Sequence, residues 1–338
     1  MILIQDYSLA IAFTILAMIG WGSWANAQKI AEKSWRFELF YWDKMTGLLL
    51  GSFLAAFTLG SLGVHGRPFL QDIAQADLTS ILYAMAGGVL WNTGNLAFVS
   101  AIALAGMSVA FPIGGGIAWM LGILVNYVLV LLAGQIPSNQ PMVLFSGMLI
   151  IIIAIFLSGR AYQRLARVTK KPSSKGILFS VVAGLFIAFF YGFVVKSLDG
   201  SLIPGGTGSL TPFTAIVFFT FGAIISTIII NPVLMRYPAQ GKPVKMAEYW
   251  KGSTREHIAG VLGGIVWMSG MVFSFMAAGA ANPAISYAMS NAAPVVAILW
   301  GLIVWKEFQG APPGTNRLLI VMFTFYVIGL VLITWSNV

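Results

Sequence analysis

The chain has 338 residues, of which 59% are hydrophobic and 9% are charged, whereas an ordinary soluble domain carries about 25% charged residues. This composition excludes a soluble globular fold, and the absence of Cys excludes a disulfide framework and a thiolate metal site. In a soluble protein the net charge of +9 would suggest acidic partners, but here the positions of the charges explain it. We expect no bound metal and no organic cofactor.

Ten stretches of the chain are long and apolar enough to cross a hydrocarbon core about 30 Å thick, which takes roughly 20 helical residues. The predicted fold class is therefore an all-α integral membrane protein with ten transmembrane helices. No Lys or Arg precedes the first stretch, so we interpret it as a retained span and not as a signal peptide. The predicted spans are 8–29, 40–62, 78–104, 107–133, 141–159, 176–197, 212–235, 257–279, 283–305 and 316–336.

Lys and Arg concentrate in the loops after the first, fifth, seventh and ninth spans, and only Arg67 and Lys196 fall elsewhere. Because Lys and Arg are enriched in short cytoplasmic loops, we expect both termini on the extracytoplasmic side of the plasma (inner) membrane. The basic run at 160–175 is better explained as a topology determinant than as a nucleic-acid patch. We therefore expect the lipid bilayer and a small-molecule substrate as partners, and no nucleic acid.

The same segment, 160–175, is a predicted cytoplasmic linker between a first five-helix repeat, 1–159, and a second repeat, 176–338. At a fixed offset of 176 residues, Gly87–Gly94 lies over Gly263–Gly270 with the shared pattern GGxxWxxG. Common packing constraints could also produce so short a match. Because five is odd, the second repeat would be inverted, an arrangement typical of secondary transporters that work by alternating access. The sequence has no GxxxxGK[ST] motif, so transport is expected to be passive or driven by an ion gradient.

Polar and aromatic side chains inside the spans are the candidate substrate-binding residues. An amide both donates and accepts hydrogen bonds, and an indole offers apolar area with one donor. Such a wall suits a neutral solute rich in hydroxyl or amide groups, although each amide could instead join two helices by a hydrogen bond. The candidates are Trp24, Asn26 and Gln28 in the first span, Trp91, Asn92 and Asn95 in the third, Trp119 in the fourth, and Ser286, Tyr287 and Asn291 in the ninth.

The fourth span of each predicted repeat is weakened at the same depth. Gly114–Gly116 in the fourth span lies over Ser290–Ala292 in the ninth under the 176-residue offset. Interrupted helices expose backbone groups that can hold a solute or an ion. Close helix packing by small residues is the alternative.

The predicted spans contain no Asp or Glu at mid-depth, so the ion-coupling candidates lie at span ends. They are Asp43, at the inner end of the second span, and Lys196, at the outer end of the sixth. The alternatives are a local ion pair of Asp43 with Lys44 or Lys29, and snorkelling of Lys196 to Asp199. The coupling ion would be a proton or sodium.

Two further types of residue lie near span ends and are expected outside the solute pathway. His257 is expected to be solvated. Trp residues at such positions commonly anchor a protein in the membrane interface. The predicted anchors are Trp42, Trp250, Trp305 and Trp335.

The sequence resembles the drug/metabolite transporter (DMT) superfamily in the tract Gly88–Leu96 and in the ending Gly301–Glu307. Within that superfamily it resembles the sugar-uptake branch that contains the rhamnose permease and glucose/ribose uptake proteins. The segments 22–43 and 56–60, with Ala84–Gly88, are also similar to plant ureide permeases. The resemblance implies a DMT-type fold, import by proton symport, and a central cavity lined by spans 1, 3, 4, 6, 8 and 9.

Together these features predict a secondary transporter that imports a small neutral polar solute. The first expectation is a monosaccharide of the ribose, rhamnose or glucose class, and the alternative is a ureide or a nucleobase. A multidrug or metabolite exporter is a further alternative, since aromatic cavities bind cations, but such a carrier would need an acidic residue in its cavity. An enzyme is not expected, because the spans hold no cluster of acids, bases and nucleophiles. A monomer would suffice for this function, and a dimer is compatible with it.

Overall fold

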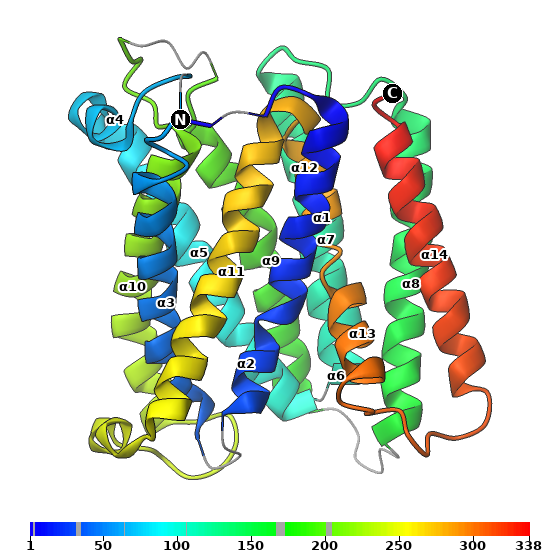
Figure 1. The fold of residues 1–338 in the computed structure, drawn as a ribbon. Helices are drawn as coiled ribbons and strands as arrows, with labels where there is room; N and C mark the ends of the chain where they lie inside the picture. The colour runs from blue at the N-terminus through cyan, green and yellow to red at the C-terminus, as the bar shows by residue number, and fades with distance from the viewer. Residues whose placement is uncertain (3, 32–34, 64, 106, 167–172, 201–204) are drawn as a thin grey trace.

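The computed structural model describes residues 1–2, 4–31, 35–63, 65–105, 107–166, 173–200 and 205–338. In these ranges the chain is helical, and the β-structure consists of an isolated bridge between Leu198 and Leu210. The helices form one elongated bundle (Figure 1). They are α1 (Tyr7–Ser23), α2 (Ala25–Ile30), α3 (Phe37–Phe57), α4 (Phe69–Gln75), α5 (Leu78–Ala105), α6 (Met107–Ala110), α7 (Gly116–Leu132), α8 (Pro141–Ala166), α9 (Ser174–Ser197), α10 (Pro212–Arg236), α11 (Thr254–Ala281), α12 (Pro283–Ser290), α13 (Pro294–Ile303) and α14 (Thr315–Trp335).

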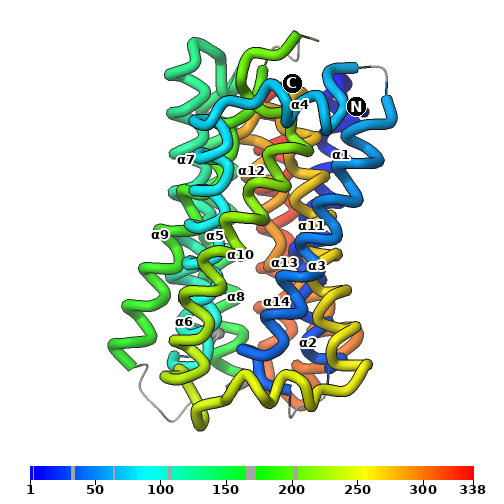
Figure 2. The backbone as a smooth tube through the Cα atoms, turned by 90° about the vertical axis from the view of Figure 1, so that its left-hand side faces the viewer, coloured from blue at the N-terminus to red at the C-terminus, as the bar shows by residue number. Residues whose placement is uncertain are grey.

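Nine helical segments of the described ranges are long and apolar enough to cross a membrane. They confirm a multi-pass membrane protein. The expected span at 40–62 corresponds to α3, whose 21 residues run the length of the bundle beside α10 and α11 (Figure 2). This helix includes Glu38, Asp43 and Lys44, and it is not among the nine segments. A tenth crossing therefore stays a prediction.

Three of the expected spans are broken in the structure. The first is split at Trp24 between α1 and α2, and the ninth at residues 291–293 between α12 and α13. The fourth contains a π-helical turn, Phe111–Gly115, between α6 and α7. Pro112 lies in that turn and Pro294 begins α13, and proline has no N–H to continue the helical ladder. The weakness that the glycine tract predicts in the fourth span is thus a local change of helix type.

The expected linker at 160–175 is partly helical in the structure. Helix α8 continues to Ala166 and α9 begins at Ser174, so the first part of the expected linker is helical. Residues 167–172 lie outside the described residues. The remaining described part of the linker is a short approach to α9, whose Ser173 hydroxyl caps the helix at the Gly176 amide.

Helices α5 and α11 pack tightly against their neighbours through glycines. Each helix has 28 residues. A side chain at Gly88 would collide with the carbonyl oxygen of Phe219 on α10, and one at Gly264 with that of Lys44 on α3. Small residues allow such close approach of helix backbones. These contacts fix the rotation of α5 and α11 and therefore the direction of their polar residues.

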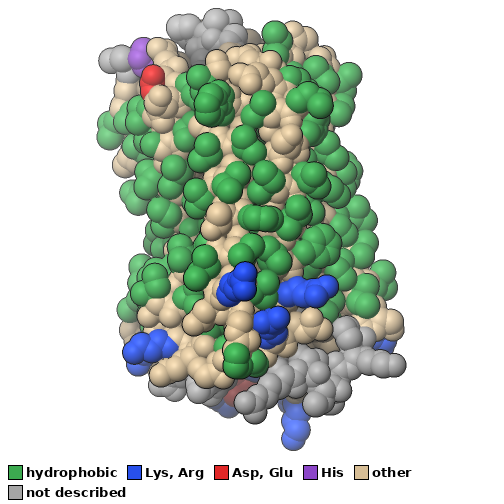
Figure 3. All heavy atoms as spheres, turned by 90° about the vertical axis from the view of Figure 1, so that its right-hand side faces the viewer, with side chains coloured by type: hydrophobic (Ala, Val, Ile, Leu, Met, Phe, Trp, Pro, Cys, Tyr) green, Lys and Arg blue, Asp and Glu red, His purple; other side chains and the backbone are tan. Residues whose placement is uncertain are grey.

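The two ends of the bundle differ: one carries both chain termini, and Lys and Arg side chains gather toward the other (Figures 1 and 3). Both termini lie at the same end (Figure 1). The face over α8 and α14 is covered by hydrophobic side chains, with Lys and Arg gathered toward the opposite end (Figure 3). Hydrophobic side chains such as Leu149 and Ile320 are well exposed on these helices, as expected for a surface in contact with lipid.

Candidate substrate-binding cavity

A cavity of about 1040 Å³ lies between α1, α2, α5, α7, α9, α11 and the α12–α13 break. Its lining includes residues of α5, α9 and α11 as well as Lys29 of α2, a helix that lies at the end of the bundle opposite the two termini (Figure 1). The wall is mainly apolar and aromatic with a few polar groups, the usual make-up of a small-molecule site. Members of both predicted repeats contribute to it.

Six of the predicted substrate-binding residues line this cavity. The indole of Trp119 is held by a 3.0 Å hydrogen bond from its Nε1 to the Ala288 carbonyl oxygen. Asn95 donates to the Tyr41 hydroxyl at 2.9 Å, and Asn291 donates to the Tyr287 carbonyl oxygen at 3.1 Å. Both bonds use the NH2 group of the amide. The six lining residues are Trp24, Gln28, Trp91, Asn95, Trp119 and Asn291.

The other four candidates, Asn26, Asn92, Ser286 and Tyr287, lie outside the cavity wall. Asn92 accepts from the Tyr41 hydroxyl at 2.5 Å and donates to Ser226 at 2.8 Å. These bonds join α5 to α3 and α10, as in the alternative explanation of a polar group within a span.

The remaining three of these candidates also make interhelical hydrogen bonds. Tyr287 donates to the Ala118 carbonyl oxygen at 2.7 Å, and Ser286 donates to the Ser274 carbonyl oxygen at the same distance. Asn26 accepts from the Trp305 indole at 2.5 Å. In this structure the three side chains are therefore satisfied by protein partners.

Two Trp residues outside the candidate set, Trp21 and Trp267, form an aromatic cluster with the candidate Trp91 in the cavity wall. Trp21 and Trp267 stack with ring centroids 5.8 Å apart, and Trp91 and Trp267 are 4.0 Å apart. All three residues line the cavity. Trp267 is the counterpart of Trp91 under the 176-residue offset, so that offset contained the signal that could have found it.

The expected membrane anchor Trp305 also lines the cavity, which corrects its assignment to the interface. It lies near an ion pair between Lys29 of α2 and Glu307, which follows α13. The Lys29 amine is 5.2 Å from the centroid of the Trp305 ring. Both charged residues line the part of the cavity toward the α2 end, so Lys29 has Glu307 and not Asp43 as its partner.

Asp43 does not line the cavity, and its partners differ from the expected lysines. Its carboxylate accepts from the Tyr249 hydroxyl at 2.5 Å and lies 3.0 Å from Nδ1 of His257. His257 is therefore paired and not simply solvated. Burial, together with the hydrogen bond to Asp43, raises the pKa of Tyr249, which lies in the connection between α10 and α11. Neither Lys44 nor Lys29 forms the expected ion pair with Asp43.

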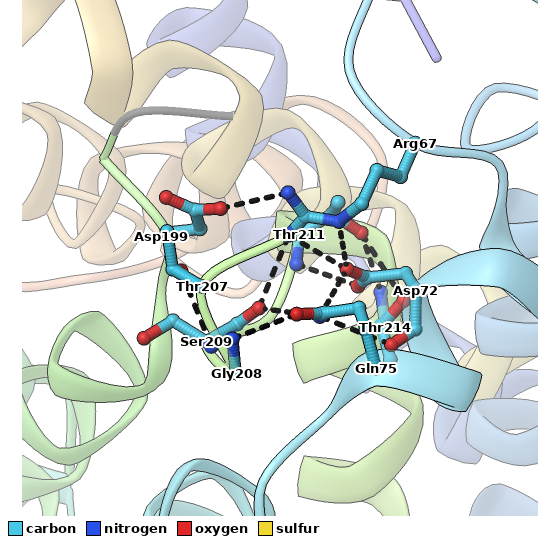
Figure 4. Close-up of polar contacts among 9 residues, drawn as sticks. All are labelled: Arg67, Asp72, Gln75, Asp199, Thr207, Gly208, Ser209, Thr211 and Thr214. Atoms are coloured by element: carbon cyan, nitrogen blue, oxygen red, sulfur yellow. Dashed lines mark hydrogen bonds and ion pairs between the residues drawn. The ribbon is translucent and has the colours of Figure 1, made fainter. Parts of the chain in front are cut away.

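Lys196 likewise lies outside the cavity, and the expected pair with Asp199 is wrong. Its amine is 5.8 Å from the centroid of the Tyr83 ring. Asp199 pairs with Arg67 at 2.8 Å. The reason is that Arg67, from the loop before α4, reaches the connection between α9 and α10 and occupies that carboxylate (Figure 4).

The surroundings of Arg67 form a buried polar cluster. Its guanidinium bonds Asp72 at 2.8 Å in addition to Asp199, and it donates to the Ser209 carbonyl oxygen at 3.1 Å (Figure 4). Burial alone lowers the pKa of Arg67, but the two carboxylates outweigh it and the net direction is upward. Asp72 also accepts from the Thr211 amide at 2.7 Å. This cluster ties the loop after α3 to the loop after α9.

The charges offer little for metal chemistry. Within the described ranges, no group of three or more His, Asp or Glu side chains is placed to hold a metal ion. Among those residues, the acid in the cavity wall is Glu307, and it is paired with Lys29. The cavity wall therefore offers mainly aromatic and amide groups.

Comparisons with known proteins place this architecture. The ureide permease family model matches residues 40–171 and 161–336. Ureide permease 1 of Arabidopsis thaliana is 24% identical over an alignment that covers 100% of this chain and 99% of the relative. Ureide permease 2 of the same plant is 25% identical, with 97% and 96% covered. Probable ureide permease A3 of Vigna unguiculata is 24% identical, with 91% and 97% covered.

A solved crystal structure of a protein aligns over 98% of both chains with a TM-score of 0.58 and 16% identity, which supports the fold alone. Permeases are transporters, so the prediction of a membrane transporter and not an enzyme is confirmed. The relatives favour the ureide permease alternative over the sugar-uptake branch that the sequence analysis put first. Because the family model covers most of its length, the chain belongs to the ureide permease family.

Proposed function

We propose that this chain imports a ureide or a nucleobase across the plasma membrane by secondary transport. The observation that carries the proposal is a cavity in which indoles and amides meet, in a chain matched almost throughout by ureide permeases. A ureide or nucleobase is small, planar and rich in carbonyl and N–H groups. Trp91 and Trp119 offer faces for the ring, while Asn95 and Asn291 offer groups that complement its edge.

The proposed mechanism is alternating access between two inverted repeats of five helices each, with α3 as the tenth span. Three features support it. Helices α5 and α11 have equal length at an offset of 176 residues, the offset partners Trp91 and Trp267 are in contact, and the fourth span of each half is interrupted. Binding sites of such carriers lie between the repeats near mid-membrane.

The proposed orientation has both termini outside the cell. Both termini share one end of the bundle (Figure 1), and the loops rich in Lys and Arg belong to the opposite end, as the positive-inside rule requires. In this orientation the cavity reaches toward the cytoplasm. A monomer is sufficient, because one chain supplies the whole cavity wall.

We also propose that a proton is the coupling ion. The pairing of Asp43 with His257 and Tyr249 provides a carboxylate, an imidazole and a phenol in contact at the cytoplasmic end. Imidazole is the side chain best suited to exchange protons near neutral pH. Sodium coupling is the alternative that the test below separates.

The experiment is solute uptake by bacteria that lack their own carriers for the labelled compounds. Cells expressing the chain are given allantoin, uracil, ribose, rhamnose or glucose, with and without a protonophore. We expect saturable uptake of allantoin or uracil that the protonophore abolishes. Uptake of a sugar alone would overturn the assigned solute class, and accumulation that needs sodium and survives the protonophore would overturn proton coupling.

A further inference from the structure

Lys44 of α3 is buried inside an aromatic cage beside the cavity. Its side chain is 0% exposed. The amine lies 3.6 Å from the ring centroid of Trp24, 5.0 Å from that of Tyr41 and 5.1 Å from that of Trp91. In the part of the chain that the structure describes, this nitrogen has no hydrogen-bond acceptor.

A buried polar group normally has a hydrogen-bond partner, and the Lys44 amine has none among the described residues. Ring faces attract a cation, but they do not replace the acceptors that three N–H groups need. A buried donor without an acceptor destabilises a protein, and native structures contain few of them. Lys44 is thus a donor that the described protein residues leave unsatisfied.

The neighbouring polar groups are already committed to other partners. Asp43, which precedes Lys44 in the chain, hydrogen-bonds with His257 and Tyr249. The Tyr41 hydroxyl donates to Asn92 and accepts from Asn95. In this structure neither group accepts a hydrogen bond from the Lys44 amine.

The cavity is a further source of an acceptor, and the Trp24 indole, whose ring centroid is 3.6 Å from the amine, is part of its wall. Trp24 and Trp91, two members of the cage, both line the cavity. Trp24 occupies the break between α1 and α2 and is partly exposed. Its backbone amide makes a long 3.3 Å bond to the Gly20 carbonyl oxygen. A residue at a helix break can turn its side chain without disturbing a regular helix.

We propose that Lys44 is a concealed specificity residue, which donates hydrogen bonds to a carbonyl oxygen of a planar solute when the Trp24 indole turns aside. The proposal rests on the proposed function and narrows its solute class. The N–H bonds of the amino group donate hydrogen bonds, so Lys44 would select solutes whose edge toward α3 presents carbonyl acceptors. Trp91 would carry the face of the same ring.

The test compares matched variants of the full-length chain in proteoliposomes. Lys44→Met fills the apolar cage and removes all donors, and replacing a buried charge by an apolar group of similar size is often tolerated. Lys44→Gln keeps a weaker donor. Lys175→Met, at an exposed lysine in the first turn of α9, is the control for loss of one lysine.

The readouts are the thermal unfolding temperature and the KM for allantoin, uracil, 2-thiouracil and 4-thiouracil. Sulfur accepts hydrogen bonds poorly, so the wild-type chain should prefer uracil to at least one thio analogue. For Lys44→Met we expect a KM for uracil at least tenfold higher, loss of that preference and an unchanged unfolding temperature. Lys44→Gln should show a smaller rise in KM, and Lys175→Met should match the wild type.

The outcomes separate this inference from the proposed function. A wild-type KM in Lys44→Met, or an equal rise in KM for uracil and both thio analogues, would overturn the role of Lys44 while uptake by the wild-type chain still supported a ureide or nucleobase permease. If the wild-type chain carried neither allantoin nor uracil, both proposals would fall. Should Lys44→Met fail to fold, Lys44→Gln decides. A wild-type KM for uracil in this variant, or an equal rise in KM for uracil and both thio analogues, would overturn the role of Lys44.

Discussion

The cavity wall and the Arg67 cluster are two polar regions with opposite patterns of hydrogen bonding. In the cluster, a guanidinium that is 1% exposed is surrounded by two carboxylates and backbone carbonyl oxygens. In the wall, the hydrogen bonds of Asn95 and Asn291 to other protein groups use their NH2 groups, and the Lys44 amine beside the wall has no acceptor among the described residues. The contrast teaches that polar groups with protein partners on all sides stabilise this fold, whereas under the proposed function those with fewer protein partners would bind the solute.

The largest expected effect is on stability and lies in the cluster. Replacing Arg67 by Met should lower the free energy of unfolding by about 3–5 kcal/mol, because Asp72 and Asp199 stay buried without their cation. Chemical unfolding of the purified protein in detergent measures this. The control is Lys251→Met, which removes an exposed ion pair with Glu248 and should change nothing measurable. Equal stability of the two variants would break the comparison.

The next largest expected effect is also on stability and concerns Asn92, which, unlike Asn95 on the same helix, does not line the cavity. Asn92→Ala should lower the free energy of unfolding by about 1–3 kcal/mol, because Tyr41 and Ser226 lose a buried partner. The same unfolding assay applies. The KM of the protein that remains folded should stay within twofold of the wild type, since Asn92 does not line the cavity. A large rise in KM without loss of stability would move Asn92 into the binding site.

In the wall, the effect should appear in transport and not in stability. Asn291→Ala removes an amide whose protein bond is to a carbonyl one turn earlier in its own chain, so we expect an unchanged unfolding temperature. The KM for the transported ureide or nucleobase should rise about tenfold, which corresponds to about 1.4 kcal/mol of lost binding. Initial uptake rates in proteoliposomes give the KM. A wild-type KM would remove Asn291 from the proposed site.

Asp43 tests whether a paired acid outside the wall serves transport. Under the proposed proton symport, a pH difference of one unit can drive about tenfold accumulation for one coupled proton. Asp43→Asn should abolish this accumulation and leave equilibration of the solute, because an amide cannot exchange the proton. Accumulation is measured in vesicles under an imposed pH gradient. Unchanged accumulation would clear Asp43 of the role.

The smallest expected effect concerns the ion pair at the cytoplasmic part of the cavity. Lys29→Met should lower the free energy of unfolding by less than about 1 kcal/mol, since the Lys29 side chain is 41% exposed and solvent weakens the attraction to Glu307. Added salt screens the same attraction in the wild type. We therefore expect Lys29→Met and added salt to change the uptake rate by similar, modest amounts. A loss of stability as large as that of Arg67→Met would show that exposure does not separate the two ion pairs.

Much of the architecture followed from local properties of the chain. Apolar stretches of sufficient length predict the nine segments that the structure identifies, because a bilayer demands continuous helices. The glycine tract at Gly114–Gly116 predicts an interruption of the fourth span, where a π-helical turn occurs. The expected second span was less clear, because α3 carries Glu38, Asp43 and Lys44 within its helix.

The partners of the charged residues could not be predicted in the same way. Asp43 and Asp199 were assigned to lysines close to them in sequence, but they meet His257 and Arg67, which lie on distant segments. Trp305 was assigned to the membrane interface from its position near a span end, yet it lines the cavity together with Glu307 and residues of α2. Sequence distance does not measure spatial distance in a bundle whose helices come from both halves of the chain.

The sequence by itself thus determined that this protein is a multi-pass helical membrane protein whose fourth and ninth spans are interrupted. The tertiary structure alone decided that Asn95 lines the cavity while Asn92, three residues earlier on α5, does not, although both bond to Tyr41 of α3. The physical reason is that helix rotation is set by packing: the contact of Gly88 with α10 turns one amide toward the cavity and the other into the bundle.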